Sequence, residues 1–224
     1  MYLKLRQDAH ILQEIQVPMI YGVGLNYLEH AQEMKSARPA EPVIFLKPPA
    51  SILPDGGVIT PPACSQEIHY ETELVVALAE NCRHLSPQDA QGVILGYGIG
   101  LDMTLRDLQA KAKAQGKPWA IAKGFATSAP LSELVPAHQV QDPQALRFEL
   151  RVNGELRQQG HAAQMLFSIP ELISYLSGIF ELQRGDLIYT GTPAGVGPVQ
   201  DGDLLSAELL GHCKLQVSVS LQNS

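Results

Sequence analysis

The chain has 224 residues, of which 45% are hydrophobic and 17% are charged, a composition typical of a globular protein with a substantial core. Its formal net charge of -7 argues against nucleic acid or an anionic membrane surface as the main partner. We expect neither a signal peptide nor a membrane span, because no apolar run approaches the roughly 20 residues that span a bilayer. Because its three cysteines also lack C-x-x-C spacing, we expect the protein to reside in the reducing cytoplasm.

The first predicted elements are a short strand at residues 20–25 and a helix directly after it. Asn26 is expected to cap this helix, with Glu29 three residues later as in a capping box. His30 and Glu33 are three apart on the same helix and so face the same way. A carboxylate beside an imidazole can orient it, raise its pKa and let it take a proton from water. The alternative is an ordinary pair on the helix surface.

The stretch EIHYETELVV at residues 67–76 predicts a strand that begins polar and ends in the core. Side chains alternate along a strand, so Glu71 and Glu73 share a face with His69. Two adjacent carboxylates repel each other, and we therefore expect a cation between them. The alternative for the two glutamates is that they are merely solvated on a half-exposed strand. His69 could support the cation site, and the alternative is that it is an ordinary hydrogen-bonded histidine.

Asp102 follows a glycine-rich apolar strand at residues 96–101, where a carboxylate has little packing reason to be. A helix is predicted to run from Thr104 until Gly116 stops it. Together with the two glutamates, Asp102 would form an oxygen-rich site that suits a hard cation, Mg²⁺ or Mn²⁺.

Three further polar residues follow Asp102 in the chain. Arg106 and Gln109 lie at positions i and i+3 of the predicted helix, and Lys123 stands in the apolar context IAKGF. The two cations would suit a substrate carboxylate or a developing oxyanion. Each could equally be a surface charge.

The remaining pattern is richer in strand than in helix. Asn153-Gly154 predicts a type I′ hairpin between alternating strands, and Ser168 with Glu171 predicts the capped start of a helix. The tail at 186–221 predicts three strands. We expect one catalytic domain over residues 1–224, with a lead-in at 1–19 and a core at 20–210, and with α+β order in place of regular βαβ alternation.

Seven segments resemble, in order, the fumarylacetoacetate hydrolase family, in particular its small single-domain branch of acylpyruvases and fumarylpyruvate hydrolases. They run from about residue 20 to residue 203 and read GLNYLEHAQEM, PVIFLKPPAS, IHYETELVVAL, GYGIGLDMTLRDLQ, KPWAIAKGF, VNGELRQ and DLIYTGTPAGVGPVQDGD. The resemblance implies an α+β, predominantly β fold, a mixed-sheet roll with a few short helices, that forms homodimers.

The resemblance also implies roles for individual residues. Mg²⁺ or Mn²⁺ would be held by Glu71, Glu73 and Asp102, and a mobile lid would carry the His30–Glu33 pair. Four more positions match residues that contact substrate or its oxyanion, namely Arg106, Gln109, Lys123 and Thr192. The sequence departs from the family in two places: residues 21–24 lack an acid that larger members supply to the metal, and residues 124–126 lack an aspartate that many members carry.

The implied activity is metal-dependent hydrolysis of a carbon–carbon bond in an acylpyruvate, a small anionic 2-oxo acid. In this hypothesis the His30–Glu33 pair activates a water, and the metal and Lys123 stabilise the departing enolate. Oxaloacetate decarboxylation or keto–enol tautomerisation on the same site is the alternative, because the same enolate would form. The third possibility is a non-catalytic protein that binds a metal or ligand on an acidic strand face.

Overall fold

A computed structural model gives the fold and describes residues 2–7, 10–33 and 37–221. The strands are Tyr2–Gln7 (β1), His10–Gln16 (β2), Ile20–Gly24 (β3), Val43–Lys47 (β4), Ile52–Pro54 (β5), Val58–Ile59 (β6), Ile68–Tyr70 (β7), Thr72–Leu78 (β8), Ile94–Leu101 (β9), Thr104–Leu105 (β10), Ala129–Leu131 (β11), Val135–Pro136 (β12), Arg147–Val152 (β13), Glu155–His161 (β14), Leu187–Tyr189 (β15), Gly197–Pro198 (β16), Leu204–Leu209 (β17) and Cys213–Val219 (β18). The α-helices are Leu28–Glu33 (α1), Pro87–Ala90 (α2), Arg106–Ala114 (α3), Ala120–Lys123 (α4) and Ile169–Ile179 (α5). None of the described helices is long and apolar enough to cross a membrane.

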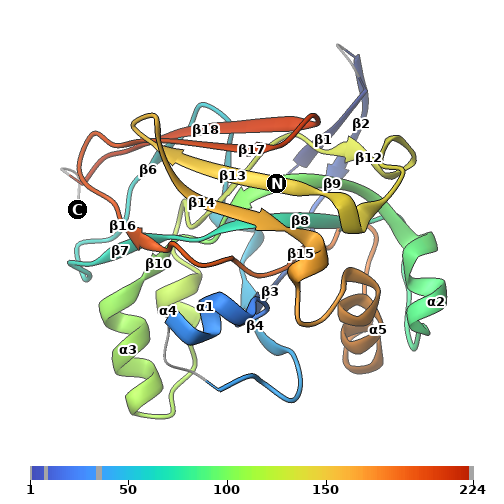
Figure 1. The fold of residues 1–224 in the computed structure, drawn as a ribbon, viewed down its shortest axis with the longest axis horizontal. Coiled ribbons are helices and arrows are strands. Elements are labelled where there is room, and N and C mark those ends of the chain that lie inside the picture. Colours follow the sequence, from blue (N-terminus) through green and yellow to red (C-terminus); the bar gives the residue numbers. More distant parts are fainter. Residues whose placement is uncertain (1, 8–9, 34–36, 222–224) are drawn as a thin grey trace.

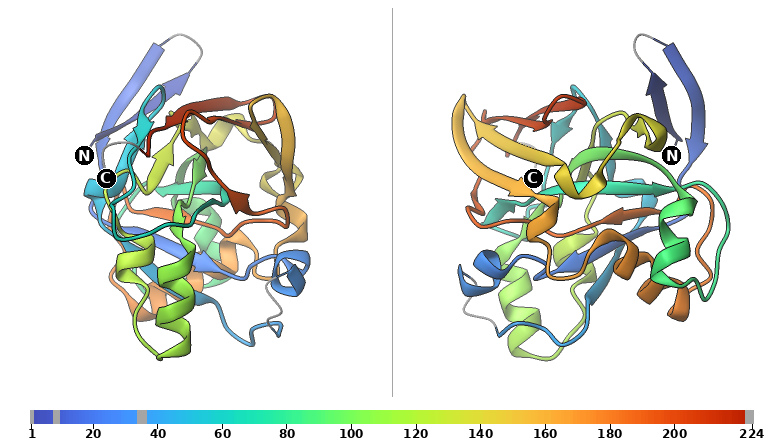
Figure 2. Two further views of the ribbon diagram at one scale, coloured as in Figure 1. Left: turned by 90° about the vertical axis from the view of Figure 1, so that its left-hand side faces the viewer. Right: turned by 45° about the vertical axis from the view of Figure 1, so that its right-hand side comes forward.

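Two curled sheets form the body of the molecule. The longer sheet runs in the order β4-β3-β15-β8-β9-β11-β5, with β12 added beside β9, and the second runs β14-β13-β17-β18-β6. Figure 1 shows the second sheet on one side of β8 and β9, with α1, α3 and α4 on the other side, and Figure 2 shows the same layers from two further directions. The predicted strand-rich α+β roll is confirmed.

The main core lies between the two sheets. Leu74 and Val76 of β8 are fully buried and belong to one apolar cluster with Phe148 and Leu150 of β13. These side chains sit at alternate positions of their strands, so each strand offers one apolar face to the other sheet. Strand β8 is therefore a central strand whose side chains are all buried.

Two predicted local structures are confirmed. Asn153 and Gly154 have φ angles of 52° and 85° between β13 and β14, and positive φ at both positions is what a type I′ turn requires. Ser168 and Glu171 form both bonds of a capping box at the start of α5. Short-range chemistry alone decided these two features.

Two predicted helix starts are wrong. Helix α1 begins at Leu28, and Asn26 does not cap it, because the Asn26 side chain is buried and bonds to Phe167 and to the carbonyl of Thr190. Helix α3 begins at Arg106, because residues 104–105 first pair with β7.

The lead-in at residues 1–19 is more structured than expected. Strands β1 and β2 pair with each other, and Leu134 accepts a hydrogen bond from Arg6 and donates one to Lys4. Leu3, Leu5 and Ile15 are buried in a second, smaller apolar cluster. Their burial comes from a partner about 130 residues away, which the local pattern could not reveal.

Candidate active site

The predicted strand through residues 67–76 is interrupted at Glu71. Strand β7 pairs with β10 and β16 in a small separate sheet, whereas β8 pairs with β9 and β15 in the long sheet. Glu71 lies where the chain passes from one sheet to the other, and its carbonyl accepts a hydrogen bond from the backbone N–H of Asp102. This bond places the end of β9 beside the start of β8.

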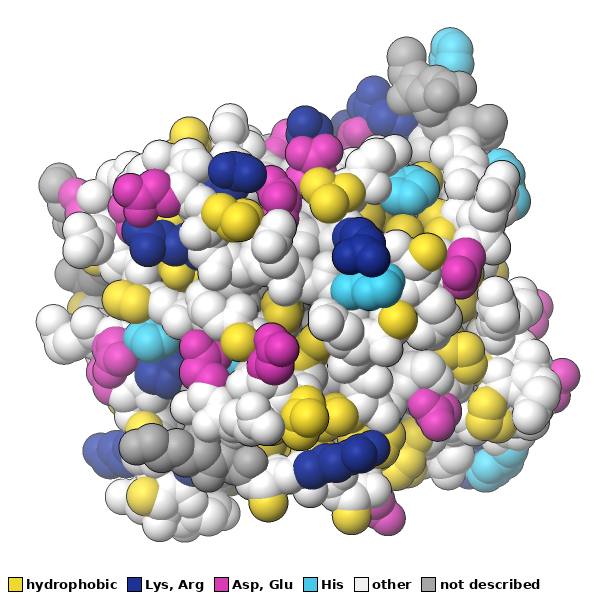
Figure 3. Space-filling view, in the orientation of Figure 1, with side chains coloured by type: hydrophobic (Ala, Val, Ile, Leu, Met, Phe, Trp, Pro, Cys, Tyr) yellow, Lys and Arg dark blue, Asp and Glu magenta, His cyan; other side chains and the backbone are white. Residues whose placement is uncertain are grey.

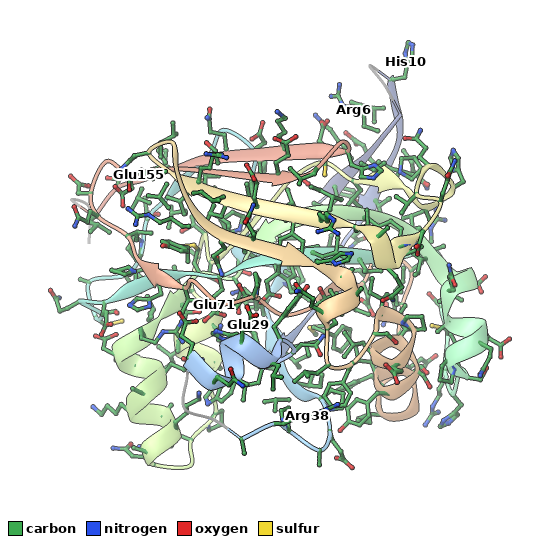
Figure 4. All side chains as sticks on the ribbon, viewed as in Figure 1. Arg6, His10, Glu29, Arg38, Glu71 and Glu155 are labelled. Atoms are coloured by element: carbon green, nitrogen blue, oxygen red, sulfur yellow. The ribbon has the colours of Figure 1, made fainter. Side chains whose placement is uncertain are left out.

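Three carboxylates converge at this junction. Glu71, Glu73 and Asp102 are 5%, 1% and 0% exposed, and one oxygen from each lies within 4.8 Å of the others. Figure 4 shows Glu71 near the centre of the molecule, above α1. The structure therefore brings together the three acids that the sequence grouped.

Two of the three acids form buried ion pairs. Lys123 Nζ donates to Glu71 Oε2 at 2.7 Å and also contacts Asp102 Oδ2, so one ammonium bridges two carboxylates. Lys47 Nζ donates to Asp102 Oδ1 at 2.5 Å. Glu73 forms no ion pair with any described residue, and its Oε2 accepts the N–H of Gly191 at 2.9 Å.

The pKa values follow from this unequal pairing. Burial would raise the pKa of Glu71, but Lys123 and Arg106 outweigh it and hold that pKa below its ordinary value. Burial raises the pKa of Glu73 well above its ordinary value, and the charges of Asp102 and Glu71 add to the effect. A cation placed among the three acids would relieve that repulsion.

Lysine 47 was not singled out from the sequence. It ends the apolar strand β4, it is fully buried, and its pKa is lowered by burial against the opposing effect of Asp102. The signal was present, since a lysine that closes the run VIFLK is as unusual as Lys123 in IAKGF.

His30 and Glu33 face each other as predicted. His30 Nδ1 lies 3.2 Å from Glu33 Oε2, and the imidazole is 5% exposed. The other carboxylate oxygen of Glu33 accepts the N–H of Gly195 at 3.2 Å. The pair is therefore held by a loop from far along the chain and is not an isolated helix-surface pair.

Arg106 extends the charged cluster. Its guanidinium donates to Glu71 Oε1 at 2.5 Å and to Gln109 Oε1 at 2.6 Å, so the predicted pair on α3 is joined. His69 Nδ1 lies 3.4 Å from Arg106 Nε. Burial and the charge of Arg106 lower the pKa of His69, which favours a neutral, hydrogen-bonded histidine.

The space around these groups is small. A cavity of about 20 Å³ is bordered by residues of all the predicted roles, including His30, Glu71, Lys123 and Thr192. That volume suits a single water and is too small for a four-carbon acid. Side chains must therefore move before an organic substrate can enter.

Two aromatic side chains lie beside the cavity. The aromatic rings of Phe45 and Trp119 border it, with Lys123 Nζ 4.9 Å from the centre of the Phe45 ring. Figure 3 shows acidic, basic and histidine side chains gathered over α1 and α3 on the outer surface.

The donor set fits a hard divalent cation. All three acids offer oxygen, which Mg²⁺ and Mn²⁺ prefer. The hydroxyl of Tyr27 is buried without a hydrogen-bond partner among the described residues, and the charge of Glu73 acts on it. An acid without an ion pair and a buried hydroxyl without a hydrogen-bond partner in the described residues are groups that a bound cation and its waters would satisfy.

Comparison with known proteins gives consistent results. Residues 19–220 match the family model described as fumarylacetoacetate (FAA) hydrolase C-terminal. The protein named oxaloacetate tautomerase FAHD1, mitochondrial, is 46% identical in Bos taurus over 89% of this chain and 90% of the relative. The protein of that name from Arabidopsis thaliana is also 46% identical, with the same shares covered.

A solved structure agrees in fold over almost the whole chain. Fumarylpyruvate hydrolase from Pseudomonas aeruginosa, in complex with Mn²⁺ and pyruvate, superposes with a TM-score of 0.93 at 38% identity. The match covers 99% of this chain and 96% of that one.

Proposed function

We propose an activity for this chain, which belongs to the fumarylacetoacetate hydrolase family. It is a divalent-metal-dependent enzyme that interconverts the keto and enol forms of oxaloacetate or a closely related 2-oxo acid. The observation that carries this proposal is one small cavity bordered by an imidazole, carboxylates and cations, including His30, Glu71, Glu73, Arg106 and Lys123. Glu33 pairs with His30, and Asp102 completes the group of three carboxylates. Such a site offers one acid–base group, the imidazole, and several positive charges that would stabilise an enolate.

His30 supplies the acid–base chemistry in this proposal. Its Nδ1–H donates to Glu33, which leaves the Nε2 lone pair free to remove a proton from the carbon next to the 2-oxo group. The C–H bond breaks, its electrons form the enolate, and the proton returns to the oxygen to give the enol. Glu33 keeps the imidazole in this tautomer and stabilises its positive form.

The cations of the chain would hold the anionic parts of the substrate. Arg106, with Gln109 beside it, would bind a carboxylate, and Lys123 would stabilise the charge that develops on the 2-oxo oxygen. Glu71, Glu73 and Asp102 would hold Mg²⁺ or Mn²⁺, which supplies further positive charge for that oxygen. The ammonium of Lys123 must leave its two acids to do this.

Hydrolysis of an acylpyruvate is the second candidate, because a relative with the same fold is a fumarylpyruvate hydrolase crystallised with Mn²⁺ and pyruvate. It was the first expectation from the sequence. Tautomerisation is placed ahead of it because the tautomerase relatives are more similar, at 46% identity against 38%. Hydrolysis would also need a water held beside His30.

One set of assays tests both candidates. Purified protein with Mn²⁺ is given the enol form of oxaloacetate, fumarylpyruvate or keto-oxaloacetate, and tautomerisation, cleavage and decarboxylation are followed separately. We expect tautomerisation to be fastest and His30→Ala to slow it by about 10²–10⁴-fold. His138→Ala, which removes an exposed histidine on another face, is the matched control.

Two outcomes would refute the assignment. Wild-type protein that cleaves fumarylpyruvate but does not tautomerise oxaloacetate would make it a hydrolase. An unchanged rate in folded His30→Ala would remove the histidine from the mechanism.

Two further properties of the protein are proposed from the sequence. We propose that two copies associate and that the protein works in the cytoplasm, where its three free cysteines would stay reduced. Sedimentation of the purified protein tests the first property, and imaging of the tagged protein in its own cells tests the second.

A further inference from the structure

Strand β8 loses its neighbour just before it reaches the site. Its pairing with β15 ends at Tyr189, opposite Val75. The chain then leaves the sheet, so Thr72, which stands between Glu71 and Glu73, has no strand beside it on that edge in the described residues. A buried backbone N–H and C=O without partners would be costly.

The side chain of Gln158 takes the place of the missing strand. Gln158 is 1% exposed and reaches across from β14 in the other sheet. Its Oε1 accepts the N–H of Thr72 at 2.9 Å, and its Nε2 donates to Thr192 Oγ1 at 2.8 Å and to the carbonyl of Pro193 at 2.9 Å. The single side-chain amide of Gln158 thus makes all three of these hydrogen bonds.

Thr192 closes the ring of bonds. Its hydroxyl accepts from Gln158 and donates to the carbonyl of Thr72 at 2.9 Å. The N–H and the C=O of Thr72 are thus both fixed, and with them the two rigid peptide planes that join Thr72 to Glu71 and to Glu73. Because a glutamate side chain starts from each plane, rotation of either plane would misdirect a carboxylate.

We propose that Gln158 is a positioning residue that, with the hydroxyl of Thr192, sets the relative orientation of Glu71 and Glu73 for the divalent cation. The inference rests on the proposed metal site and adds a residue that neither the sequence nor the family resemblance singled out. It also gives the Thr192 hydroxyl a task other than substrate contact, since its single proton is already donated to Thr72.

The test measures binding of Mn²⁺ alone, without substrate, to variants of the full chain. Gln158→Met removes all three side-chain bonds, and Thr192→Val removes the hydroxyl at nearly constant volume. Each should weaken Mn²⁺ binding by about 10–100-fold, the usual cost of losing a group that orients a metal ligand. Thr192→Ser keeps the hydroxyl and should bind nearly as the wild type does.

Two controls separate positioning from general stability. Ser177 is fully buried, accepts the N–H of Leu85 and donates to the carbonyl of Ser174, at the α5 end of the molecule. Ser177→Ala should lower the melting temperature and leave the Mn²⁺ affinity unchanged. The double variant Gln158→Met with Thr192→Val should bind Mn²⁺ no more weakly than the single variant with the lower affinity, because both changes break the same ring of hydrogen bonds.

Each contrary result has a distinct meaning. Folded Gln158→Met or Thr192→Val with wild-type affinity would overturn the inference, as would an equal loss of affinity in Ser177→Ala. Failure of the wild type to bind Mn²⁺ would overturn both this inference and the metal part of the proposed function. Intact Mn²⁺ binding without turnover of any tested acid would refute the proposed reaction alone.

Discussion

Strand β8, taken with Glu71 directly before it, has two halves of opposite character. Residues 74–78 are fully or almost fully buried among apolar side chains from both sheets, and another apolar side chain of similar volume would serve there. Residues 71–73 are just as buried but carry two acids, and every partner there is an individual hydrogen bond or ion pair. Stability is concentrated in residues 74–78, and the capacity to bind a cation in residues 71–73.

The largest expected effect on folding comes from the apolar half. Leu78→Ala leaves a void in the main core, where Leu78 is fully buried, and should lower the free energy of unfolding by about 2–5 kcal/mol. Denaturant unfolding measures the loss. The folded fraction should still bind Mn²⁺ as the wild type does, and weakened binding would show that the two halves of β8 are not independent.

The acidic half should respond in the opposite way. Glu73→Gln keeps an oxygen for the N–H of Gly191 and removes a charge that repels Glu71 and Asp102 and has no ion pair among the described residues. The metal-free protein should therefore unfold at the same or a higher denaturant concentration. Loss of a ligand should weaken Mn²⁺ binding by about 100-fold or more, since losing only an orienting group costs about 10–100-fold.

A destabilised metal-free Glu73→Gln would contradict this expectation. It would mean that the charge of Glu73 has a stabilising partner in the folded protein. Glu208→Gln, at an acid of β17 paired with Lys214, is the matched control, with no expected effect on Mn²⁺ binding.

The smallest expected effect, on stability as a function of pH, concerns a carboxylate beside the apolar end of β8. Asp186 is 1% exposed, and its carbonyl accepts the N–H of Leu78. Burial raises the pKa of Asp186 from 3.8 to about 6, and its Oδ1 has no partner among the described residues. Among the residues that the structure describes, this buried acid forms no ion pair, unlike Glu71 and Asp102.

The sign of the pH effect follows from that shift. The folded state holds the proton of Asp186 more tightly than the unfolded state does, so stability falls as pH rises from about 4 to about 6. Relative to Asp186→Asn, the wild type should lose melting temperature across this window, by about 2–4 °C for each 1 kcal/mol. A constant difference between the two proteins from pH 4 to pH 7 would contradict the raised pKa.

How much could be predicted from the sequence depended on the range of the interactions. The Asn153-Gly154 turn and the capping box at Ser168 follow from residues within four positions of each other, and both are confirmed. The same reasoning failed for Asn26, whose side chain bonds residues 141 and 164 positions away. A local rule could not show that a distant loop would take its side chain.

Strand periodicity and a lone acid at a strand end are local signals, and they were enough to predict that Glu71, Glu73 and Asp102 share one site. Which charges pair with which could not be predicted, because it depends on tertiary contacts. The ion pairs of Lys47 and Lys123 with Asp102 span 55 and 21 positions, and the bond from Gln158 to Thr72 spans 86. Such contacts depend on how the two sheets pack, since the side chains that meet across them have no fixed spacing in the chain.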